Sequence, residues 1–451
     1  MRKRISAFFS VLAAIVLLTV PASAASSGST LKIICADAGQ VIFTPPGSTQ
    51  YAYRYGPAIL IDGDRIDIWA SAPPLVSNGV RYGNDSIEYI RSTDGGKTWT
   101  GWKTVLYPTL NSEDQWSTCD PGAFKYGDYY YVGYTGSPEF RTNPDKEKQV
   151  NNLFIARAKN PEGPYEKWNG NGWGGDPYAI TRYSGDGVGC SMPSFTVKGD
   201  TLYMYYVDQT HPDQDWNSEG NISVSTFSLK DPNWPGNELS NKMCENKPEE
   251  VRYCPDIDKF IGFQLKGGWD YDSYVEIYES TDGVNFTKTS SFRNNFPHYA
   301  HNIGISGNNL GQLDLSIQNY IGTAYTPTGV EAWWGHWHTQ LIPLYIREEQ
   351  PSSTTPSQPS GSTDSSSQKP TTSSVGSTDG ESSETEVSEP QNSNIESTVS
   401  DDKDKDKEVN NKTEQQEETS YLWLYIVIGA VVVLAGAGTA VYFLVIKKKH
   451  V

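Results

Sequence analysis

The sequence predicts an all-β fold, a five-bladed β-propeller, followed by a disordered stalk and one transmembrane helix. The main observation is a hairpin that recurs five times, each copy running from a short apolar strand through a Gly/Asp/Asn turn into a second strand. The five copies are Gly56–Asp64, Asp120–Asp128, Met192–Asp200, Arg252–Asp256 and His301–Asn308. Their first three prolines, Pro57, Pro121 and Pro193, lie 64 and 72 residues apart. A spacing of this length is sufficient for one four-stranded sheet per copy. Such sheets repeated around an axis form a β-propeller.

Each copy has a second inner strand rich in aromatic and β-branched residues, and further strand pairs lie between the copies. The second inner strands are expected at 66–70, 129–134, 202–207, 260–263 and 312–317. The outer strands are expected at 87–91, 104–107, 153–158, 222–227, 274–279 and 286–290. The segment Thr30–Phe43 precedes the first copy, and we expect it to pair with the strand at Leu341–Ile346. Such pairing completes the last blade and removes the open sheet edges.

The two ends of the chain predict export and anchoring. Residues 1–24 read as a signal peptide: Arg2, Lys3 and Arg4 precede an apolar run that ends in small residues. Near the C-terminus, 421–446 is a run of 26 residues without a charge. At 1.5 Å per residue it is long enough to cross an apolar layer of ~30 Å. The basic stub 447–451 should stay inside, which places the head outside the cell.

A stalk is predicted between the head and the membrane helix. Residues 349–420 are rich in Ser, Thr, Pro and acidic residues and almost free of large apolar side chains. Such a segment cannot bury enough surface to fold. Its charges also repel one another, so it should extend and hold the head away from the membrane.

The remaining segment, 27–348, is the predicted propeller head. It keeps a net negative charge, because the chain carries −18 and the stalk accounts for only part of it. An acidic head argues against nucleic acid as a partner. The head also holds 12 of the 13 tryptophans. We expect most of them to pack between the blades and some to line the axial mouth, where aromatic faces stack on sugar rings.

The chain has five cysteines, all in the head. Two pairings stay open, Cys119 with Cys190 and Cys244 with Cys254. An odd count leaves Cys35 or another thiol without a partner in the chain. No Cys/His spacing is typical of a zinc site.

Two outer turns, Ser92–Trp99 and Ser280–Phe286, resemble the Asp-box of sialidases and related propellers. The inner strands at Asp120–Tyr131 and Met192–Tyr206, with the segment Asn151–Tyr165, resemble the five-bladed glycoside hydrolases. These are the arabinanase/β-xylosidase group, family 43, and its invertase-like relatives. The resemblance covers nearly the whole head.

The resemblance implies inverting hydrolysis by three carboxylates: an Asp base on blade one, an Asp that tunes pKa on blade two, and a Glu acid on blade three. An inverting enzyme holds acid and base ~6.5–9.5 Å apart with a water between them. Asp120 matches the blade-two Asp, whereas Gly56 stands at the blade-one position and Ser191-Met192 at the blade-three position. Two of the three carboxylates are therefore not matched.

The sequence offers a shifted set of residues at the axial mouth. Asp120 and Glu250 are the candidate catalytic carboxylates. The candidate substrate-binding residues are Arg54, Arg252, His301, Trp116 and Trp269. The two arginines would suit an acidic sugar, or they would form salt bridges with Asp120 and Glu250. His301 matches a position where relatives place a His near an axial metal or water.

These observations predict a membrane-anchored cell-surface protein whose propeller head acts on or binds a glycan at its central axial pocket. The alternative is a non-catalytic glycan-binding or adhesion protein that has lost the acid and base of the hydrolases. No cofactor is expected apart from an axial calcium ion near His301, whose presence the sequence leaves open. Whether a second carboxylate faces Asp120 distinguishes the two functions.

Overall fold

Twenty-five β-strands and no helix make up the part of the chain that the structure describes. The computed structural model describes residues 29–47, 52–143, 146–182, 188–210, 220–327 and 335–349. All of them belong to the first of two compact units, Met1–Gln358, the second being Pro359–Val451. The predicted signal peptide (1–24), membrane helix (421–446) and basic stub (447–451), and all of the stalk beyond Glu349, lie outside these ranges. Within them, no helix is long and apolar enough to span a bilayer.

Most of the strands form five antiparallel groups of four or five strands, taken here in chain order and each called a sheet; the first and the fifth are joined into one nine-stranded sheet. The first sheet is β3 (Tyr55–Asp62), β4 (Arg65–Ala72), β7 (Ser86–Ser92) and β8 (Lys103–Leu106). The second is β9 (Ser117–Tyr126), β10 (Tyr129–Ser137), β13 (Asn152–Ala158) and β14 (Glu166–Lys167). The third is β15 (Gly189–Lys198), β16 (Thr201–Gln209), β17 (Asn221–Ser228) and β18 (Glu238–Met243). The fourth is β19 (Glu250–Cys254), β20 (Lys259–Lys266), β21 (Tyr274–Ser280) and β22 (Thr287–Phe292). The fifth is β23 (Ala300–Gly307), β24 (Asn319–Tyr325), β25 (His338–Glu349) and β1 (Thr30–Cys35), and β2 (Gln40–Phe43) also pairs with β25.

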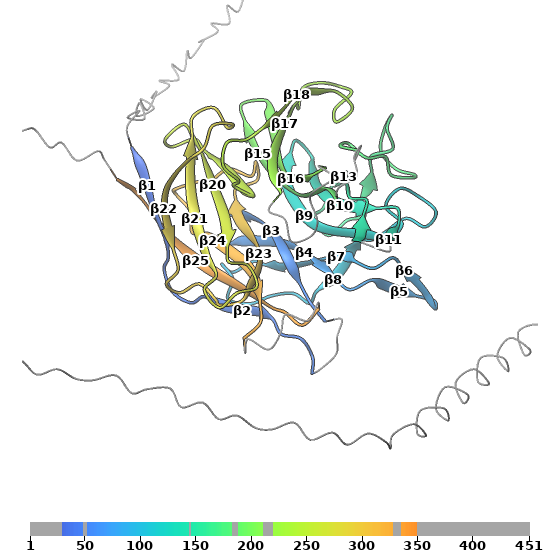
Figure 1. Cartoon of the computed structure of the whole chain (residues 1–451), viewed down its shortest axis with the longest axis horizontal. Helices are drawn as coiled ribbons and strands as arrows, with labels where there is room; N and C mark the ends of the chain where they lie inside the picture. The colour runs from blue at the N-terminus through green and yellow to red at the C-terminus, as the bar shows by residue number, and fades with distance from the viewer. Residues whose placement is uncertain are drawn as a thin grey trace, which may run out of the picture. The chain divides into compact units, whose positions relative to one another are not determined.

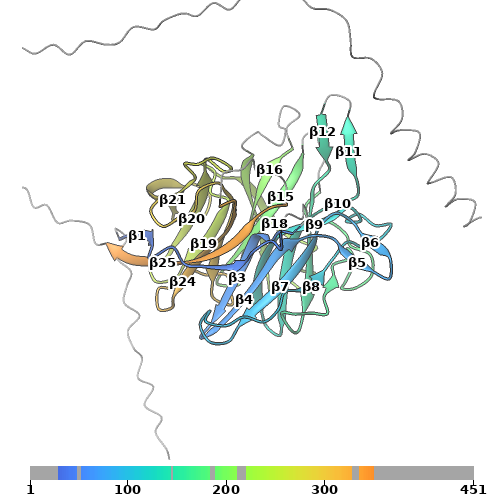
Figure 2. The same cartoon turned by 90° about the horizontal axis from the view of Figure 1, so that it is seen from below.

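Two short ribbons extend from the first two sheets. They are β5 (Leu75–Ser77) with β6 (Val80–Tyr82), and β11 (Phe140–Asn143) with β12 (Lys146–Gln149). Figures 1 and 2 show the sheets following one another around the head, from blue through cyan, green and yellow to orange.

The first strands of the sheets form a closed ring. β3 contacts β9, β9 contacts β15, β15 contacts β19, β19 contacts β23, and β23 contacts β3 again. The last contact includes a short parallel pairing at Ser306↔Ile59 and Gly307↔Leu60. Such a ring of antiparallel sheets is the arrangement of a β-propeller. Two glycines permit the close approach: a Cβ at Gly122 would lie 2.0 Å from the Pro193 carbonyl oxygen, and one at Gly304 1.6 Å from that of Pro57.

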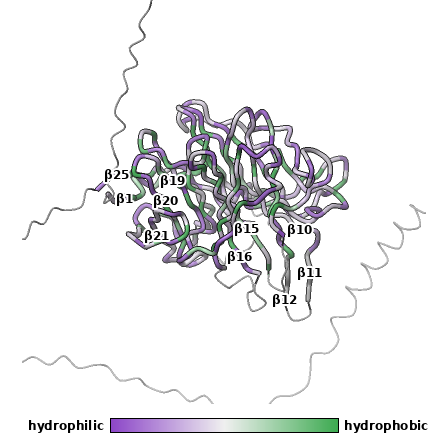
Figure 3. Tube along the Cα trace, turned by 90° about the horizontal axis from the view of Figure 1, so that it is seen from above, coloured by the Kyte–Doolittle hydropathy of each residue, from purple (hydrophilic) through white to green (hydrophobic). Residues whose placement is uncertain are grey.

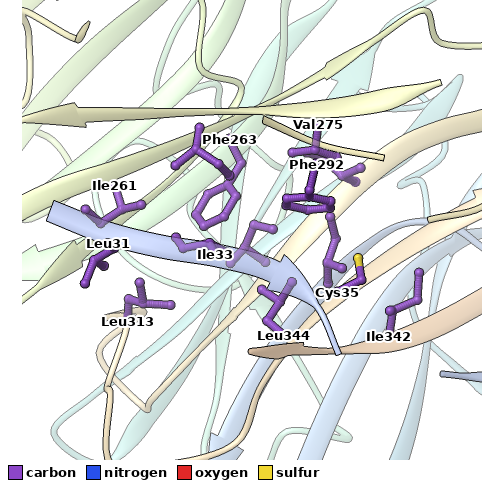
Figure 4. Close-up of a cluster of buried hydrophobic side chains, with 14 of the residues drawn as sticks. Leu31, Ile33, Cys35, Ile261, Phe263, Val275, Phe292, Leu313, Ile342 and Leu344 are labelled. Atoms are coloured by element: carbon purple, nitrogen blue, oxygen red, sulfur yellow. The ribbon is translucent and has the colours of Figure 1, made fainter. Parts of the chain in front are cut away.

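The N-terminal strand completes the fifth sheet by pairing with the last strand, as the sequence predicts. β1 runs antiparallel to β25 over Thr30↔Glu349 to Cys35↔Leu344. Its residues alternate between exposed and buried, and Leu31, Ile33 and Cys35 face the core. Figure 4 shows these three side chains among residues of the fourth and fifth sheets, including Phe263 and Phe292. Figure 3 shows hydrophobic (green) stretches through the interior of the head and mainly hydrophilic (purple) outer loops.

One predicted strand is wrong. The second strand of the fifth hairpin is β24, Asn319–Tyr325, and the expected strand at 312–317 is a loop. Asn308 Oδ1 accepts hydrogen bonds from the backbone nitrogens of Leu310 and Gln312, at 2.9 and 3.1 Å. Leu313 nevertheless lies in the core. Hydrogen bonds from side chains to the backbone compete with strand pairing. The apolar residues of this loop are therefore buried in the core although the loop pairs with no strand.

Both disulfides that the sequence left open are also wrong. All five cysteines are free and buried. Cys119 contacts Ser117 and Asp120, whereas Cys244 and Cys254 belong to different hydrophobic clusters. The core of a head this large is stable without covalent links.

The two outer turns that resemble an Asp-box are held by their own side chains. Asp94 Oδ1 accepts from the Thr98 backbone nitrogen at 2.9 Å, and Ser92 Oγ accepts from that of Gly96 at 2.8 Å. Asp282 accepts in the same way from Val284 and Asn285. Hydrogen bonds from the hydroxyl and the backbone nitrogen of Thr98, and from Ser92, lower the pKa of Asp94 to about 2. Both aspartates therefore cap turns.

Candidate functional site

Four of the five first strands carry the same irregularity at one end of the ring. In β3, β9, β15 and β23 the pairing register shifts, and the residue at the shift has a positive φ: Gly56 (57°), Asp120 (47°), Met192 (57°) and Asn302 (57°). A β-bulge redirects a side chain. A positive φ costs about 1–3 kcal/mol for a residue other than glycine and is concentrated at functional sites. This shared geometry makes the end of the ring the candidate site.

These four residues meet around Asp120. Asn302 Nδ2 donates to Asp120 Oδ1 at 3.4 Å and lies 3.8 Å from Met192 Sδ. A Cβ at Gly56 would be 3.4 Å from Asp120 Oδ1. The first, second, third and fifth sheets thus place one residue each at a common axial position, which we call the axial site.

Asp120 is the carboxylate of the axial site. Its backbone nitrogen donates to Ser71 Oγ at 2.7 Å, and the Cys119 thiol donates to its Oδ2 at 3.4 Å. Burial raises the pKa of Asp120 to about 6; hydrogen bonds from Cys119 and Thr135 oppose the rise, and the charge of Asp85 adds to it. No cationic side chain among the described residues pairs with it. The carboxyl therefore changes its charge near neutral pH.

Asp85 is a second carboxylate near Asp120, which the sequence analysis missed. It is buried directly before β7 and accepts hydrogen bonds from Tyr53 Oη (2.5 Å), Ser117 Oγ (2.8 Å) and Asn84 Nδ2 (3.1 Å). Burial raises its pKa, and these three hydrogen bonds oppose the rise. Asp85 stands outside the hairpin repeat, so the repeat could not reveal it.

Aromatic rings cover the axial site beside the fifth sheet. The imidazole of His301 lies 4.1 Å from the Trp269 ring, 4.4 Å from the Trp337 ring and 5.5 Å from the Tyr55 ring, between centroids. Burial lowers the pKa of His301 to about 3, so the ring is neutral at physiological pH. Trp269 keeps 37% of its surface exposed and has a φ of 72°. It is therefore the aromatic face of this group that a ligand can reach.

Glu250 and Arg252 pair with each other and not with Asp120. Arg252 Nη2 lies 2.8 Å from Glu250 Oε2, and the same guanidinium donates to Ser194 Oγ at 2.7 Å and to the Ile305 carbonyl oxygen at 2.6 Å. Burial raises the pKa of Glu250, and the charge of Arg252 opposes the rise. The pair connects β15, β19 and β23. The expected partnership of Glu250 with Asp120 is not seen, and no hydrogen bond or ion pair between described residues joins them.

Arg54 also lies away from Asp120. Its Nη2 is 2.5 Å from Glu88 Oε2, and its guanidinium lies over the rings of Phe43 and Trp102, at 4.6 and 5.6 Å from their centroids. Tyr53 and Tyr55, on either side of it, face the axial aromatic group. Side chains alternate along an extended segment, so Arg54 points to the opposite side. The expectation that it faces the axial mouth is corrected accordingly.

Trp116 lies beside Asp85. Its backbone nitrogen donates to the Ser137 carbonyl oxygen at 2.9 Å, and its carbonyl oxygen accepts from Asn84 at 2.6 Å. It is half-buried at the junction of the first and second sheets. Of the predicted residues, Asp120 lies at the axial site; His301 directly precedes Asn302 of that site and packs against Trp269. Trp116 adjoins Asp85 through Asn84.

The described residues contain no group of three or more His, Cys, Asp or Glu side chains that could hold a metal ion. The calcium ion near His301 stays a prediction. The chemistry of the axial site rests on one weakly acidic carboxyl, the amide of Asn302, the thiol of Cys119 and an accessible indole. Such a set can hydrogen-bond hydroxyl groups and stack on the apolar face of a ring.

No protein-family model and no curated protein matches the chain. Among solved structures, the α-L-arabinofuranosidase of Podospora anserina, in complex with cellotriose, is 12% identical with a TM-score of 0.47, over 71% of this chain and 98% of that chain. The catalytic domain of a Coprinopsis cinerea family 62 α-L-arabinofuranosidase is 12% identical with a TM-score of 0.48, over 70% and 98%. A family 43 α-L-arabinofuranosidase of Clostridium thermocellum is 15% identical with a TM-score of 0.40, over 61% and 83%. Family 43 is the group that the sequence motifs resemble, and similarity at this level assigns no activity to the chain.

Proposed function

We propose that the chain is a cell-surface protein whose head, a closed five-bladed β-propeller, binds a glycan at the axial site. The five sheets are its blades, and β1 completes the last one. Residues 1–24 direct export, 349–420 form the stalk, 421–446 anchor the protein, and 447–451 stay inside the cell. Supporting this topology, the charged and apolar segments at the two ends are typical of a signal peptide and a stop-transfer helix.

The observation that carries the proposal is the position of Asp120. Its carboxyl has no cationic partner among the described residues and lies on a strained bulge; Asn302, which donates to it, directly follows His301, whose ring packs against the exposed indole of Trp269. Holding a buried carboxyl without a counter-charge lowers stability. This loss of stability occurs at a position where a carboxyl group could bind the hydroxyl groups of a sugar.

Binding without hydrolysis fits the contacts better than catalysis. Inverting hydrolysis needs a second carboxylate free to activate water. Glu250 is held by Arg252, and Asp85 already accepts three hydrogen bonds. Neither is free to serve as that base.

A hydrolase remains the second candidate because of one observation. A pKa of about 6 is what a general acid at neutral pH needs, and Asp85 contributes to that value. In that case Asp120 would donate the proton to the leaving group, and another group would activate the water.

The test is a glycan array and a panel of chromogenic aryl glycosides, applied to the purified full chain and to Asp120→Asn and Trp269→Ala. Binding without turnover that both substitutions weaken supports the glycan-binding head. Turnover that Asp120→Asn abolishes supports the hydrolase. If the wild-type chain neither binds nor cleaves any glycan, or if both variants behave like it, the axial site is not a glycan site.

A further inference from the structure

A second cavity, of about 300 Å³, lies on the first sheet, on the side of the 52–55 segment that faces away from the axial group. Arg54 lines this cavity, whereas its neighbours Tyr53 and Tyr55 face the axial aromatic group. The extended segment 52–55 therefore separates this cavity from the axial aromatic group. The volume is at the lower end of the range, ~300–1,000 Å³, typical of small-molecule sites.

Polar groups are fixed on one side of the cavity. Arg54 and Glu88 form their ion pair there, and Thr104 Oγ1 is 3.5 Å from Glu88 Oε1. The guanidinium is further held by the Tyr53 carbonyl oxygen at 2.5 Å and by the ring of Phe43. Burial lowers the pKa of Arg54, and the charge of Glu88 opposes this fall. A charged pair held in this way is preorganised for a ligand.

The other walls are apolar. They are formed by Phe43, Pro46, Ala52, Pro73, Pro74, Leu75 and Val76. Prolines and the β5–β6 ribbon give these walls a rigid backbone. A few fixed polar groups against apolar walls are the usual composition of a small-molecule pocket.

The charge of the pair selects the class of ligand. Because Arg54 is already neutralised by Glu88, an anionic ligand would be repelled by the carboxylate, and a cationic one by the guanidinium. Hydroxyl groups can accept from one and donate to the other without displacing either. We propose that this cavity is a second binding site, for a neutral, hydroxyl-rich molecule of the size of one sugar ring. It goes beyond the axial site and does not depend on it.

The test uses a thiol introduced at the cavity wall. Val76 is 64% exposed and all five native cysteines are buried, so V76C labels selectively with a bulky maleimide. Labelling fills the cavity without touching Arg54 or Glu88. The matched control is V80C on the neighbouring strand β6, which does not line the cavity and is 41% exposed.

Saturation-transfer NMR is recorded on the full chain in detergent with D-glucose, D-galactose and D-xylose, and with D-glucuronate and D-glucosamine as charged comparators. We expect at least one neutral sugar to bind. Labelling at position 76 should weaken it by at least about tenfold, as should Glu88→Gln, which removes a charged hydrogen-bond acceptor. Labelling at position 80 should leave this binding unchanged. The part of the signal that labelling at position 76 removes should be the same in the Asp120→Asn variant as in the wild type.

Three results would overturn the proposal. The first is that no neutral sugar gives a signal that labelling at position 76 removes. The second is that a charged sugar binds there more tightly than the neutral ones. The third is binding that Asp120→Asn removes and labelling does not; the sugar then occupies the axial site, so the proposed function stands and the second site falls.

Discussion

The carboxyl of Asp120 is expected to make the stability of the head depend on pH. Its folded pKa of about 6 lies above its ordinary value of 3.8, so the folded state holds this proton more tightly than the unfolded state. The group therefore favours folding most below pH 4, and this contribution is lost as the pH rises from about 4 to 6. A shift of roughly two units corresponds to at most about 3 kcal/mol.

Asp120→Asn removes this dependence. Near pH 4 the variant and the wild type should unfold at similar urea concentrations. By pH 7 the variant should be the more stable, by up to about 3 kcal/mol. Urea unfolding at pH 4, 5, 6 and 7 measures the difference. A variant less stable than the wild type at pH 7 would mean that the ionised carboxylate has a stabilising partner.

Replacing Glu250 is expected to lower the stability of the head, because Glu250 forms an ion pair with Arg252. Glu250→Gln leaves the buried guanidinium of Arg252 without its counter-charge, which should cost about 3–5 kcal/mol. The control is Glu166→Gln, whose partner Arg157 is 3.3 Å away in a half-exposed pair; its loss should cost less than about 1 kcal/mol. Equal melting temperatures for the two variants would contradict a structural role for the Glu250–Arg252 pair.

The hairpin repeat marks two of the residues that the sequence identified. Asp120 precedes a repeat proline and lies at the axial site; His301 opens a repeat, directly before Asn302, which donates to Asp120. Asp85 and Glu88 lie outside the repeat. Glu88, on β7, pairs with Arg54, which lies directly before β3 and is distant in sequence. No local pattern encodes such a pairing. The prediction for Arg54 was wrong because a sequence repeat indicates where the backbone of a residue lies but not in which direction its side chain points.

At the scale of the strand, β1 offers a comparison within two adjacent residues. Ile33 is 2% exposed and faces the core that Figure 4 shows, whereas Ile34 is 38% exposed on the other side of the strand. Ile33→Ala should lower the free energy of unfolding by about 2–5 kcal/mol because it leaves a cavity. Ile34→Ala should change it by less than about 0.5 kcal/mol. Urea denaturation measures both, and a small effect of Ile33→Ala would show that β1 contributes little to closing the ring.

The hairpins were the elements that the sequence predicted best. Gly63, Gly127 and Gly199 each adopt a positive φ, of 62°, 58° and 62°, at the first position of a two-residue turn. Only glycine enters that conformation at no cost, so Gly-Asp between apolar runs is a physical signal. The fifth hairpin has no such pair at its turn, and the chain forms the long loop 308–318 before β24. In this loop the pattern of apolar residues predicted correctly that side chains are buried, but it predicted a strand where the structure has a loop.

At the scale of the whole molecule, the ring joins the two ends of the head. β1 and β25 pair over six residues, so the last described strand is fixed next to the first. The core holds the head together without any disulfide. A head of this kind should keep its fold when it is cut from its predicted stalk, because the described strands pair among themselves within residues 30–349.

The proposed topology then predicts release of the intact head. Trypsin added outside intact cells should cut within 351–420, where Lys412, which is followed by Thr413, lies among residues that cannot form a core. The paired strands of the head should resist at the same protease concentration. Immunoblotting of medium and cells should show the head moving to the medium. A chain truncated before residue 421 serves as control and should reach the medium without protease. If protease leaves the full-length head on the cells, or if the truncated chain stays inside them, the stalk-and-anchor topology is wrong.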